Sequence, residues 1–280
     1  MSGETNFALN HIATPGLDSR GFIDMAARLG CVGVELRNDL VDKGLTTRDF
    51  FDGESPATIG AYARDKGVRL LGLSEAYGFN RWSEEMKRKI EVLIAQAKES
   101  GAESISLIPS NDGVKEPTAT RLADLRTALA AIRPMLETAK MKALIEPLGF
   151  TTSSLRLKRE AIGAIEAVGG KDCFQLVHDT FHHFLAGERE FFPDMTGIVH
   201  ISGVIDPEVQ PEAMQDGHRI LVSAYDRLGN IEQIKAIEAL GYKGAYSFEP
   251  FAASVHADPA MESSLSDSMR FIRDAIAQAG

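Results

Sequence analysis

The feature that most constrains this fold is a repeat of short apolar runs separated by longer amphipathic segments. Each run is apolar on both faces, as parallel strands covered by helices are. Eight runs alternate with eight predicted helices, which indicates a closed (β/α)8 TIM barrel, a single domain over residues 1–280. The predicted strands are FALNH (7–11), GVELR (33–37), RLLGLS (69–74), SISLIPS (104–110), KALIEPLG (142–149), FQLVHD (174–179), GIVHISG (197–203) and GAYSFEP (244–250).

The segments between the runs carry helix signals. Ser83 followed by two acids is typical of a helix N-terminus, and several segments end in glycine just before the next run. An open doubly wound sheet is the alternative topology. However, the glycine-rich fingerprints of nucleotide-binding folds are missing from the sequence. The clearest predicted helices are residues 21–30, 83–101 and 118–140, with a last helix near 260–278.

Composition narrows the class of partner. The formal charge is −10, from 30 basic and 40 acidic residues, and no Lys/Arg cluster forms a basic patch, so we expect no nucleic-acid binding.

The sequence shows no signal-peptide pattern and no run near the ~18 apolar residues of a membrane span, so no membrane partner is expected. Cys31 and Cys173 lie in apolar runs, which predicts buried free thiols and a cytoplasmic location.

Four successive predicted strands each carry one potential metal ligand at or near their carboxyl ends. Because these ends converge on the rim where barrel enzymes hold their chemistry, we expect the four side chains to surround one cation. Three carboxylates and one imidazole suit a divalent ion such as Mn²⁺, Mg²⁺, Co²⁺ or Zn²⁺. The predicted ligands are Glu146, Asp179, His200 and Glu249.

A structural role competes with each of these assignments. A single acid at a strand end, such as Asp179, is usually a helix cap or a salt-bridge partner. Four such residues on four successive strands favour a site. His182 follows in the next loop, where it is expected to contact a substrate. His178 is expected to face the helices as a core histidine, and His183 to lie on the helix side or in solvent.

Further residues near the strand ends are candidates for substrate contact. Asn10 and His11 end the first predicted strand, and Arg37 ends the second. Glu35 alternates with Arg37 and is expected to pair with it locally. The segment 204–230 is too long for an ordinary connection, which predicts an active-site loop that acts as a lid or binding flap.

At these residues the sequence resembles the xylose-isomerase-like TIM-barrel superfamily of sugar isomerases and epimerases, and within it the inosose (2-keto-myo-inositol) isomerases. The resemblance implies that the four predicted ligands bind one divalent metal. It also implies that Glu146 and Glu249 flank the substrate as acid and base, and that His182 contacts a substrate oxygen. The stretches that carry it are FALNHIAT, GVELR, ALIEPLG, VHDTFHHF, VHISG and YSFEPF.

Two further stretches refine this resemblance. DGHR (216–219) is similar to the Asp-x-x-Arg stretch of the family, which places Arg219 near the ligand. Relatives continue with a Pro-Gly-x-Gly turn, but this chain continues with ILVSAYDRLGNIEQI, which leaves the substrate open. Apurinic endonucleases of the superfamily bind three zinc ions with extra histidines from the third and fourth strands. LLGLSEA and SISLIPSN carry none, which argues against DNA repair.

The resemblance predicts a metal-dependent isomerase or epimerase of a keto-inositol or similar polyhydroxy ketone. The expected chemistry is proton transfer through a metal-stabilised enediolate. The same enediolate can lose a β-hydroxyl, so a dehydratase acting on an inosose or dehydroshikimate-like ketone is one alternative. A non-catalytic sugar-binding barrel is another. The expected partner is this small-molecule substrate, and assembly into a homo-oligomer stays open.

Overall fold

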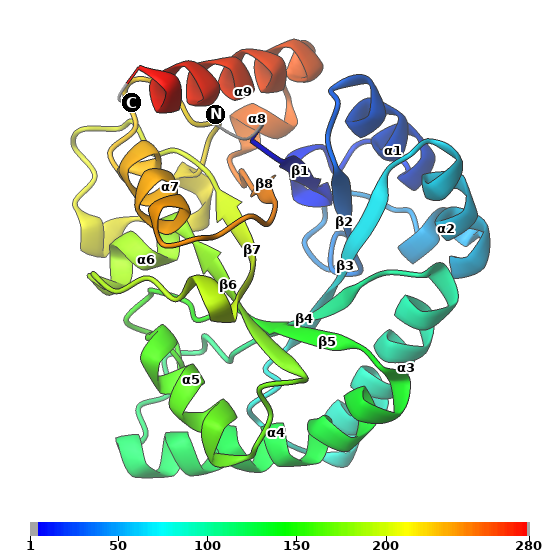
Figure 1. Cartoon of the computed structure of the whole chain (residues 1–280), viewed down its shortest axis with the longest axis vertical. Helices are drawn as coiled ribbons and strands as arrows, with labels where there is room; N and C mark the ends of the chain where they lie inside the picture. The colour runs from blue at the N-terminus through cyan, green and yellow to red at the C-terminus, as the bar shows by residue number, and fades with distance from the viewer. Residues whose placement is uncertain (1–4, 279–280) are drawn as a thin grey trace.

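The computed structural model describes residues 5–278, which form a closed barrel of eight parallel strands inside a ring of helices (Figure 1). Each strand is hydrogen-bonded to the next in sequence, and β8 closes the barrel by pairing with β1. The predicted single-domain (β/α)8 barrel is confirmed. The strands are β1 (Phe7–Asn10), β2 (Gly33–Arg37), β3 (Arg69–Tyr77), β4 (Ser104–Ile108), β5 (Lys142–Ile145), β6 (Phe174–Asp179), β7 (Thr196–Ile201) and β8 (Tyr246–Phe248).

The helices begin and end close to the positions that the sequence predicts. Ser83 caps α3 by accepting a hydrogen bond from the backbone N–H of Met86. Both cysteines are buried and unpaired, as expected. Among residues 5–278, no helix is long and apolar enough to cross a membrane. The helices are α1 (Ser19–Arg28), α2 (Pro56–Asp65), α3 (Glu84–Ser100), α4 (Thr118–Ala139), α5 (Lys158–Ala167), α6 (Thr180–Ala186), α7 (Asn230–Ala239), α8 (Ala253–His256) and α9 (Met261–Ala277).

Side chains of each strand point alternately toward the helices and into the barrel. The outward residues, such as Leu9 and Phe248, join the large core between strands and helices. The inward residues in the amino-terminal part of the barrel form a separate apolar layer. That layer consists of Ala8, Leu71, Leu144, Val177, Ile198 and Ala245.

The same alternation creates the polar end of the barrel. Two residues beyond Leu144, Val177 and Ile198, the inward positions are Glu146, Asp179 and His200. Asp179 pairs in register with His200, so the two side chains lie at the same height. On β8 the inward series from Ala245 leads through Ser247 to Glu249. An apolar layer therefore supports a polar layer directly above it.

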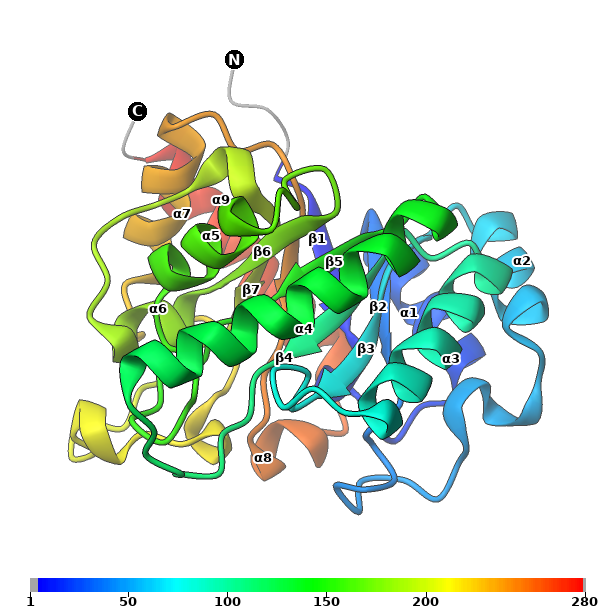
Figure 2. The same cartoon turned by 90° about the horizontal axis from the view of Figure 1, so that it is seen from below.

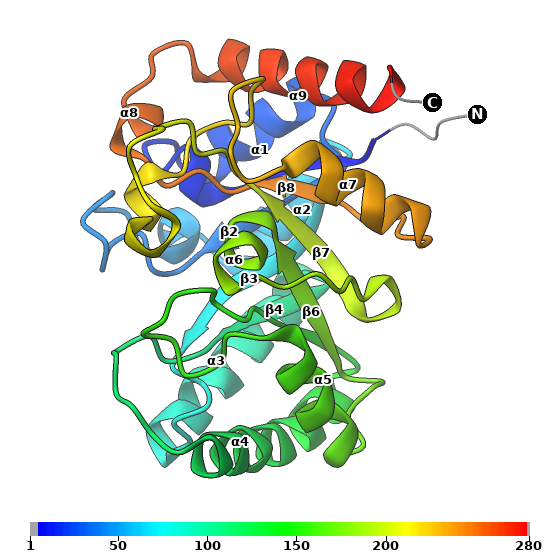
Figure 3. The same cartoon turned by 90° about the vertical axis from the view of Figure 1, so that its left-hand side faces the viewer.

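The segment 204–230 lies at the carboxyl end of the barrel, on the same side as α8 (Figures 2 and 3). An antiparallel bridge joins Gly203 to Ile220, and two short 3-10 helices lie between these two residues in the sequence. The segment is fixed by packing rather than loosely attached, and its role as an active-site loop stays a prediction. Its buried apolar side chains are Val204, Met214, Val222 and Leu228.

The contact between α2 and α3 generates a prediction about stability. A Cβ on Gly60 would stand 1.8 Å from the carbonyl oxygen of Ser100, so Gly60→Ala must push the two helices apart. We expect a loss of about 1–3 kcal/mol, seen as a lower Tm in thermal unfolding. Gly163→Ala in α5 is the matched control, because nothing lies within 4 Å of its added Cβ. The control should gain about 0.5–1 kcal/mol from helix propensity. Equal Tm values would contradict the contact.

Candidate metal centre and active site

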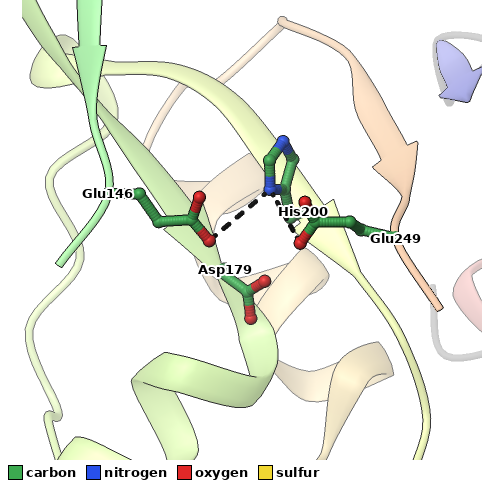
Figure 4. A group of neighbouring side chains, drawn as sticks. All are labelled: Glu146, Asp179, His200 and Glu249. Atoms are coloured by element: carbon green, nitrogen blue, oxygen red, sulfur yellow. Dashed lines mark ion pairs between the residues drawn. The ribbon is translucent and has the colours of Figure 1, made fainter. Parts of the chain in front are cut away.

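Four side chains meet at the carboxyl end of the barrel (Figure 4). One ligand atom from each lies within 4.8 Å of the ligand atoms of the other three. None of the four residues is more than 4% exposed. These are the four residues that the strand ends predicted, namely Glu146, Asp179, His200 and Glu249.

His200 is oriented like an imidazole that binds a metal. Its Nε2 lies 3.1 Å from both carboxylate oxygens of Glu35, and Ser247 donates a hydrogen bond to that carboxylate at 2.6 Å. The opposite nitrogen, Nδ1, is buried without a hydrogen-bond partner among residues 5–278 and faces Glu249 at 3.2 Å and Glu146 at 3.7 Å. A carboxylate behind the ring and a free nitrogen facing acidic groups are typical of a ligand histidine.

The electrostatics of His200 favour positive charge at this place. Burial alone would lower the pKa of His200, but the charges of Glu249, Glu35 and Glu146 outweigh it and raise that pKa well above its ordinary value. A cation at Nδ1 would supply the same positive charge and displace the proton. The donor set therefore fits a divalent metal ion.

The wider surroundings also contain excess negative charge. Six carboxylates are buried or nearly buried at this end of the barrel. Among residues 5–278, the Arg and Lys side chains that pair with them are those of Arg37, Arg219 and Lys43, and Lys43 lies 3.4 Å from Asp39. Such a surplus is costly without further positive charge. The six carboxylates belong to Glu35, Asp39, Glu75, Glu146, Asp179 and Glu249.

Glu249 is held on both carboxylate oxygens. Oε1 accepts hydrogen bonds from Asn10 at 3.2 Å and from Arg37 at 2.9 Å, and Oε2 accepts one from Arg219 at 2.9 Å. Burial raises the pKa of Glu249, but the positive charges of His200 and Arg219 outweigh this and hold the pKa well below its usual range. Glu249 is thus an ionised and firmly oriented carboxylate.

The environment of Glu146 differs from that of Glu249. Within residues 5–278 the carboxylate of Glu146 accepts no hydrogen bond, and the basic nitrogens within 4.0 Å of it are His200 Nδ1 at 3.7 Å and His182 Nε2 at 3.9 Å. Burial, followed by the charge of Glu249, raises the pKa of Glu146 to about 7. The two glutamates therefore share one site in different environments.

Asp179 combines a structural role with its place in the group. Its Oδ1 caps α6 by accepting a hydrogen bond from the backbone of His182 at 3.0 Å, and its Oδ2 accepts one from Arg219 at 2.6 Å. The helix cap and the salt bridge expected of a lone strand-end acid are both present. Neither excludes a site, because the same carboxylate also lies within the four-residue group.

Arg219 reaches this group from the long segment. It is 1% exposed, its Nε donates to Ser202 at 2.9 Å, and its guanidinium carbon lies over the rings of Phe181 and Phe251, at 5.0 and 4.7 Å from their centroids. Its pairing with Asp179 places it at the centre of the site. The structure thus brings Arg219 into contact with two of the four grouped residues, and its contact with a ligand stays a prediction.

Comparison with protein-family models identifies the family to which this chain belongs. The family model described as xylose isomerase-like TIM barrel matches residues 23–275. The chain belongs to the xylose isomerase-like TIM barrel family. The superfamily inferred from the strand-end motifs is confirmed.

Solved structures with this xylose isomerase-like fold cover nearly the whole chain. A xylose isomerase domain containing protein from Salmonella typhimurium LT2 is 30% identical, with a TM-score of 0.88 and coverage of 99% of this chain and 98% of that one. The IolI protein, solved with a bound zinc atom, is 15% identical, with a TM-score of 0.84 and coverage of 98% and 99%. D-psicose 3-epimerase from Clostridium cellulolyticum H10, solved with D-tagatose, is 15% identical, with a TM-score of 0.71 and coverage of 97% and 99%. A search of curated proteins found no match.

The three histidines around Asp179 occupy different parts of this xylose isomerase-like barrel. His182 lies in α6 rather than in a loop and faces Glu146. His178 faces the helices, where its Nε2 lies 3.0 Å from the side-chain oxygen of Gln233 in α7, as expected of a core histidine. His183 is on the helix side and buried.

His11 and Asn10 separate at the end of β1. Asn10 contacts Glu249 and belongs to the site. His11 instead donates to the carbonyl oxygen of Leu17 at 3.0 Å and stacks on Phe22 of α1. Burial lowers the pKa of His11 to about 4, so the ring is neutral at pH 7. The structure therefore does not bring His11 to the four-residue group.

The expected local pair between Glu35 and Arg37 is wrong. Both side chains point inward, but at different heights: Glu35 meets His200, while Arg37 binds Asp39 at 2.6 and 2.8 Å, Glu75 at 3.1 Å and Glu249 at 2.9 Å. Arg37 thus uses most of its N–H groups on carboxylates. The sequence analysis did not assign Glu35 to the site. Its inward position on β2, two residues before Arg37, could have indicated that it faces the barrel interior.

The contact behind His200 generates a prediction about metal affinity. Glu35→Gln keeps all four predicted ligands but weakens the acceptor that orients the His200 ring. We expect affinity for Zn²⁺ to fall about 10–100-fold, measured by titration against a competing chelator. Glu103→Gln is the control, because Glu103 pairs with Arg69 on the surface. Unchanged zinc affinity in Glu35→Gln would show that Glu35 does not support a metal ligand.

Proposed function

We propose that this protein is a divalent-metal-dependent isomerase or epimerase that acts on a keto-inositol or a similar polyhydroxy ketone. The observation that carries the proposal is a buried four-ligand group in which Glu146 and Glu249 occupy the two outer strand ends. Family membership, the zinc atom bound by the IolI protein and the epimerase with the same fold support it. The sequence resemblance to inosose isomerases supports the choice of substrate.

Glu146, Asp179, His200 and Glu249 would hold the metal ion. When bound, such an ion supplies Lewis-acid stabilisation of negative charge that develops on the substrate oxygens. Asp179 is fixed for this task by the α6 backbone and by Arg219. His200 is fixed by Glu35 behind it.

The two glutamates are the groups that move protons. Isomerisation of a hydroxyketone removes a proton from the carbon beside the carbonyl and returns one to the neighbouring carbon, and epimerisation returns it to the opposite face. β6 and β7 lie between the strands that precede Glu146 and Glu249, so the two carboxylates can approach a small substrate from two sides. Glu249 is oriented by Asn10, Arg37 and Arg219, whereas Glu146 is free of hydrogen bonds among the described residues.

We expect His182 to contact a substrate oxygen near Glu146. Its Nδ1 is buried and has no hydrogen-bond partner in the described part of the chain, and its Nε2 lies 3.9 Å from Glu146. Phe150 and Phe181 pack edge-on against the ring, with centroids at 5.1 and 5.2 Å. A buried unpaired nitrogen costs free energy that a hydrogen bond to a ligand would offset.

The reaction type is tested by incubating the protein with Mn²⁺ and a panel of inososes and ketohexoses in D₂O. We expect NMR to show deuterium on the carbon beside the carbonyl without loss of water. Glu146→Gln and Glu249→Gln should each reduce turnover about 10²–10⁴-fold, because each removes a positioned acid or base. Loss of water would identify the dehydratase alternative, and absence of exchange on every ketone would indicate a non-catalytic barrel.

The proposed role of His182 gives a separate expectation. His182→Ala should lower kcat/KM at least tenfold, since one hydrogen bond to a charged or developing-charge group contributes about 1.5–3 kcal/mol. Metal content, measured by elemental analysis, should stay near one equivalent per chain. Asp179→Asn is the contrasting variant and should lose metal. Loss of metal in His182→Ala would instead make His182 a ligand.

A further inference from the structure

The short helix α6 presents consecutive histidines to two different environments. His182 faces the site, whereas His183 faces the layer between the barrel and α5. The helix has only seven residues, and a helix of that length is not stable by itself. The position of His182 therefore depends on what holds α6 from behind.

A buried ion pair lies directly behind this helix. Lys158, the first residue of α5, is only 3% exposed. Its Nζ lies 2.6 Å from Glu188 Oε2 and 2.9 Å from His183 Nδ1, and its backbone N–H donates to Glu188 Oε1 at 2.8 Å. Glu188 in turn follows the C-terminal end of α6, and its backbone N–H donates to the carbonyl oxygen of His183. The three residues form a closed ring of contacts.

The chemistry of these three contacts shows which group donates and which accepts each hydrogen bond. A lysine ammonium only donates, so Nδ1 of His183 accepts and the ring proton lies on Nε2. Burial and the neighbouring Lys158 charge lower the pKa of His183 to about 3, so the ring stays neutral. Its other face packs on His178 and Phe191, with centroids at 4.8 and 4.9 Å. Within residues 5–278, the side chains of Lys158, His183 and Glu188 make no hydrogen bond or ion pair with the four-ligand group.

The front of α6 is equally constrained. A Cβ on Gly149, three residues after Glu146, would stand 2.3 Å from the carbonyl oxygen of His182, so the loop after β5 packs directly on the helix backbone. Arg156 donates to the carbonyl oxygens of Gly149 at 2.8 Å and Leu185 at 3.3 Å, which joins the same two segments. A shift of α6 would therefore move His182 relative to Glu146.

We infer that Lys158, Glu188 and His183 are positioning residues that hold α6 so that His182 meets the substrate beside Glu146. A buried ion pair is rarely the most stabilising choice, since well-packed apolar residues often serve as well. Its value here is orientation, because each partner accepts only a narrow geometry. This inference rests on the proposed function for its kinetic consequence, and on the structure alone for the placement of His182.

The test removes both charges together. Lys158→Met/Glu188→Gln leaves no unpaired buried charge and keeps an acceptor for the backbone N–H of residue 158. Tm and zinc content, measured first, should stay near those of the native protein. kcat/KM, measured on a ketone that the native protein turns over, should fall roughly 10–100-fold, as expected when His182 is slightly misplaced in the site. Should this variant fail to fold, Lys158→Arg takes its place, because it keeps the charge but changes the geometry.

A double-mutant cycle separates positioning from general damage. In a His182→Ala background, the same pair replacement should change kcat/KM less than about twofold, because the group it positions is gone. Arg121→Met/Glu160→Gln is the matched control: this pair also joins the first turn of α5, at 2.8 Å, but does not touch α6. It should leave kcat/KM unchanged.

A second measurement does not depend on turnover. In zinc-loaded protein labelled with ¹⁵N-histidine, the His182 ring signals, identified by their loss in His182→Ala, should shift in Lys158→Met/Glu188→Gln and stay unchanged in the control. Unchanged His182 signals, or an equal loss of kcat/KM with and without His182, would overturn the inference. If the native protein turns over no ketone, the proposed function fails. The ¹⁵N signals of the His182 imidazole still decide whether Lys158, Glu188 and His183 position His182.

Discussion

The concentration of negative charge at one end of the barrel is the constraint on which the rest of the site depends. Six carboxylates are buried or nearly buried there, and within residues 5–278 the Arg and Lys side chains that pair with them are three, Arg37, Arg219 and Lys43. Arg37 and Arg219 bridge the carboxylates, and His200 lies among them with one unpartnered nitrogen. A divalent cation would complete this balance, and the hydrogen bonds to Asp179, Glu249 and His200 orient three of the four candidate ligands.

The barrel makes this concentration of charge geometrically possible. Parallel strands in register bring inward side chains of neighbouring strands to the same height, as the pairing of Asp179 with His200 shows. The apolar layer below excludes water from the base of the site. Arg219 is fully buried, and its guanidinium packs on the aromatic rings of Phe181 and Phe251. Such enclosure strengthens each electrostatic interaction within the site.

Structural and candidate functional roles are combined in single side chains. Asp179 caps α6 and also presents an oxygen to the four-residue group. The helix that it caps carries His182, and the reverse side of that helix rests on Lys158 and Glu188. A change in any of these groups therefore reaches the site through the placement of a seven-residue helix. The function proposed for the barrel depends on packing outside it as well as on the ligands inside.

The sequence by itself determined the barrel and the four candidate ligands. Strand periodicity is local, and parallel topology brings strand ends together whatever the loops do, so Glu146, Asp179, His200 and Glu249 were predictable. Only the tertiary structure decided the partners of these residues. Glu35 and His200 are 165 residues apart, and Arg37 and Glu249 are 212 apart. The pairing of such residues depends on side-chain height and direction inside a closed barrel, which no local pattern encodes. His11 lies beyond the end of β1, because the strand stops at Asn10 and a 3-10 helix begins at His11, so its ring packs on Phe22 of α1.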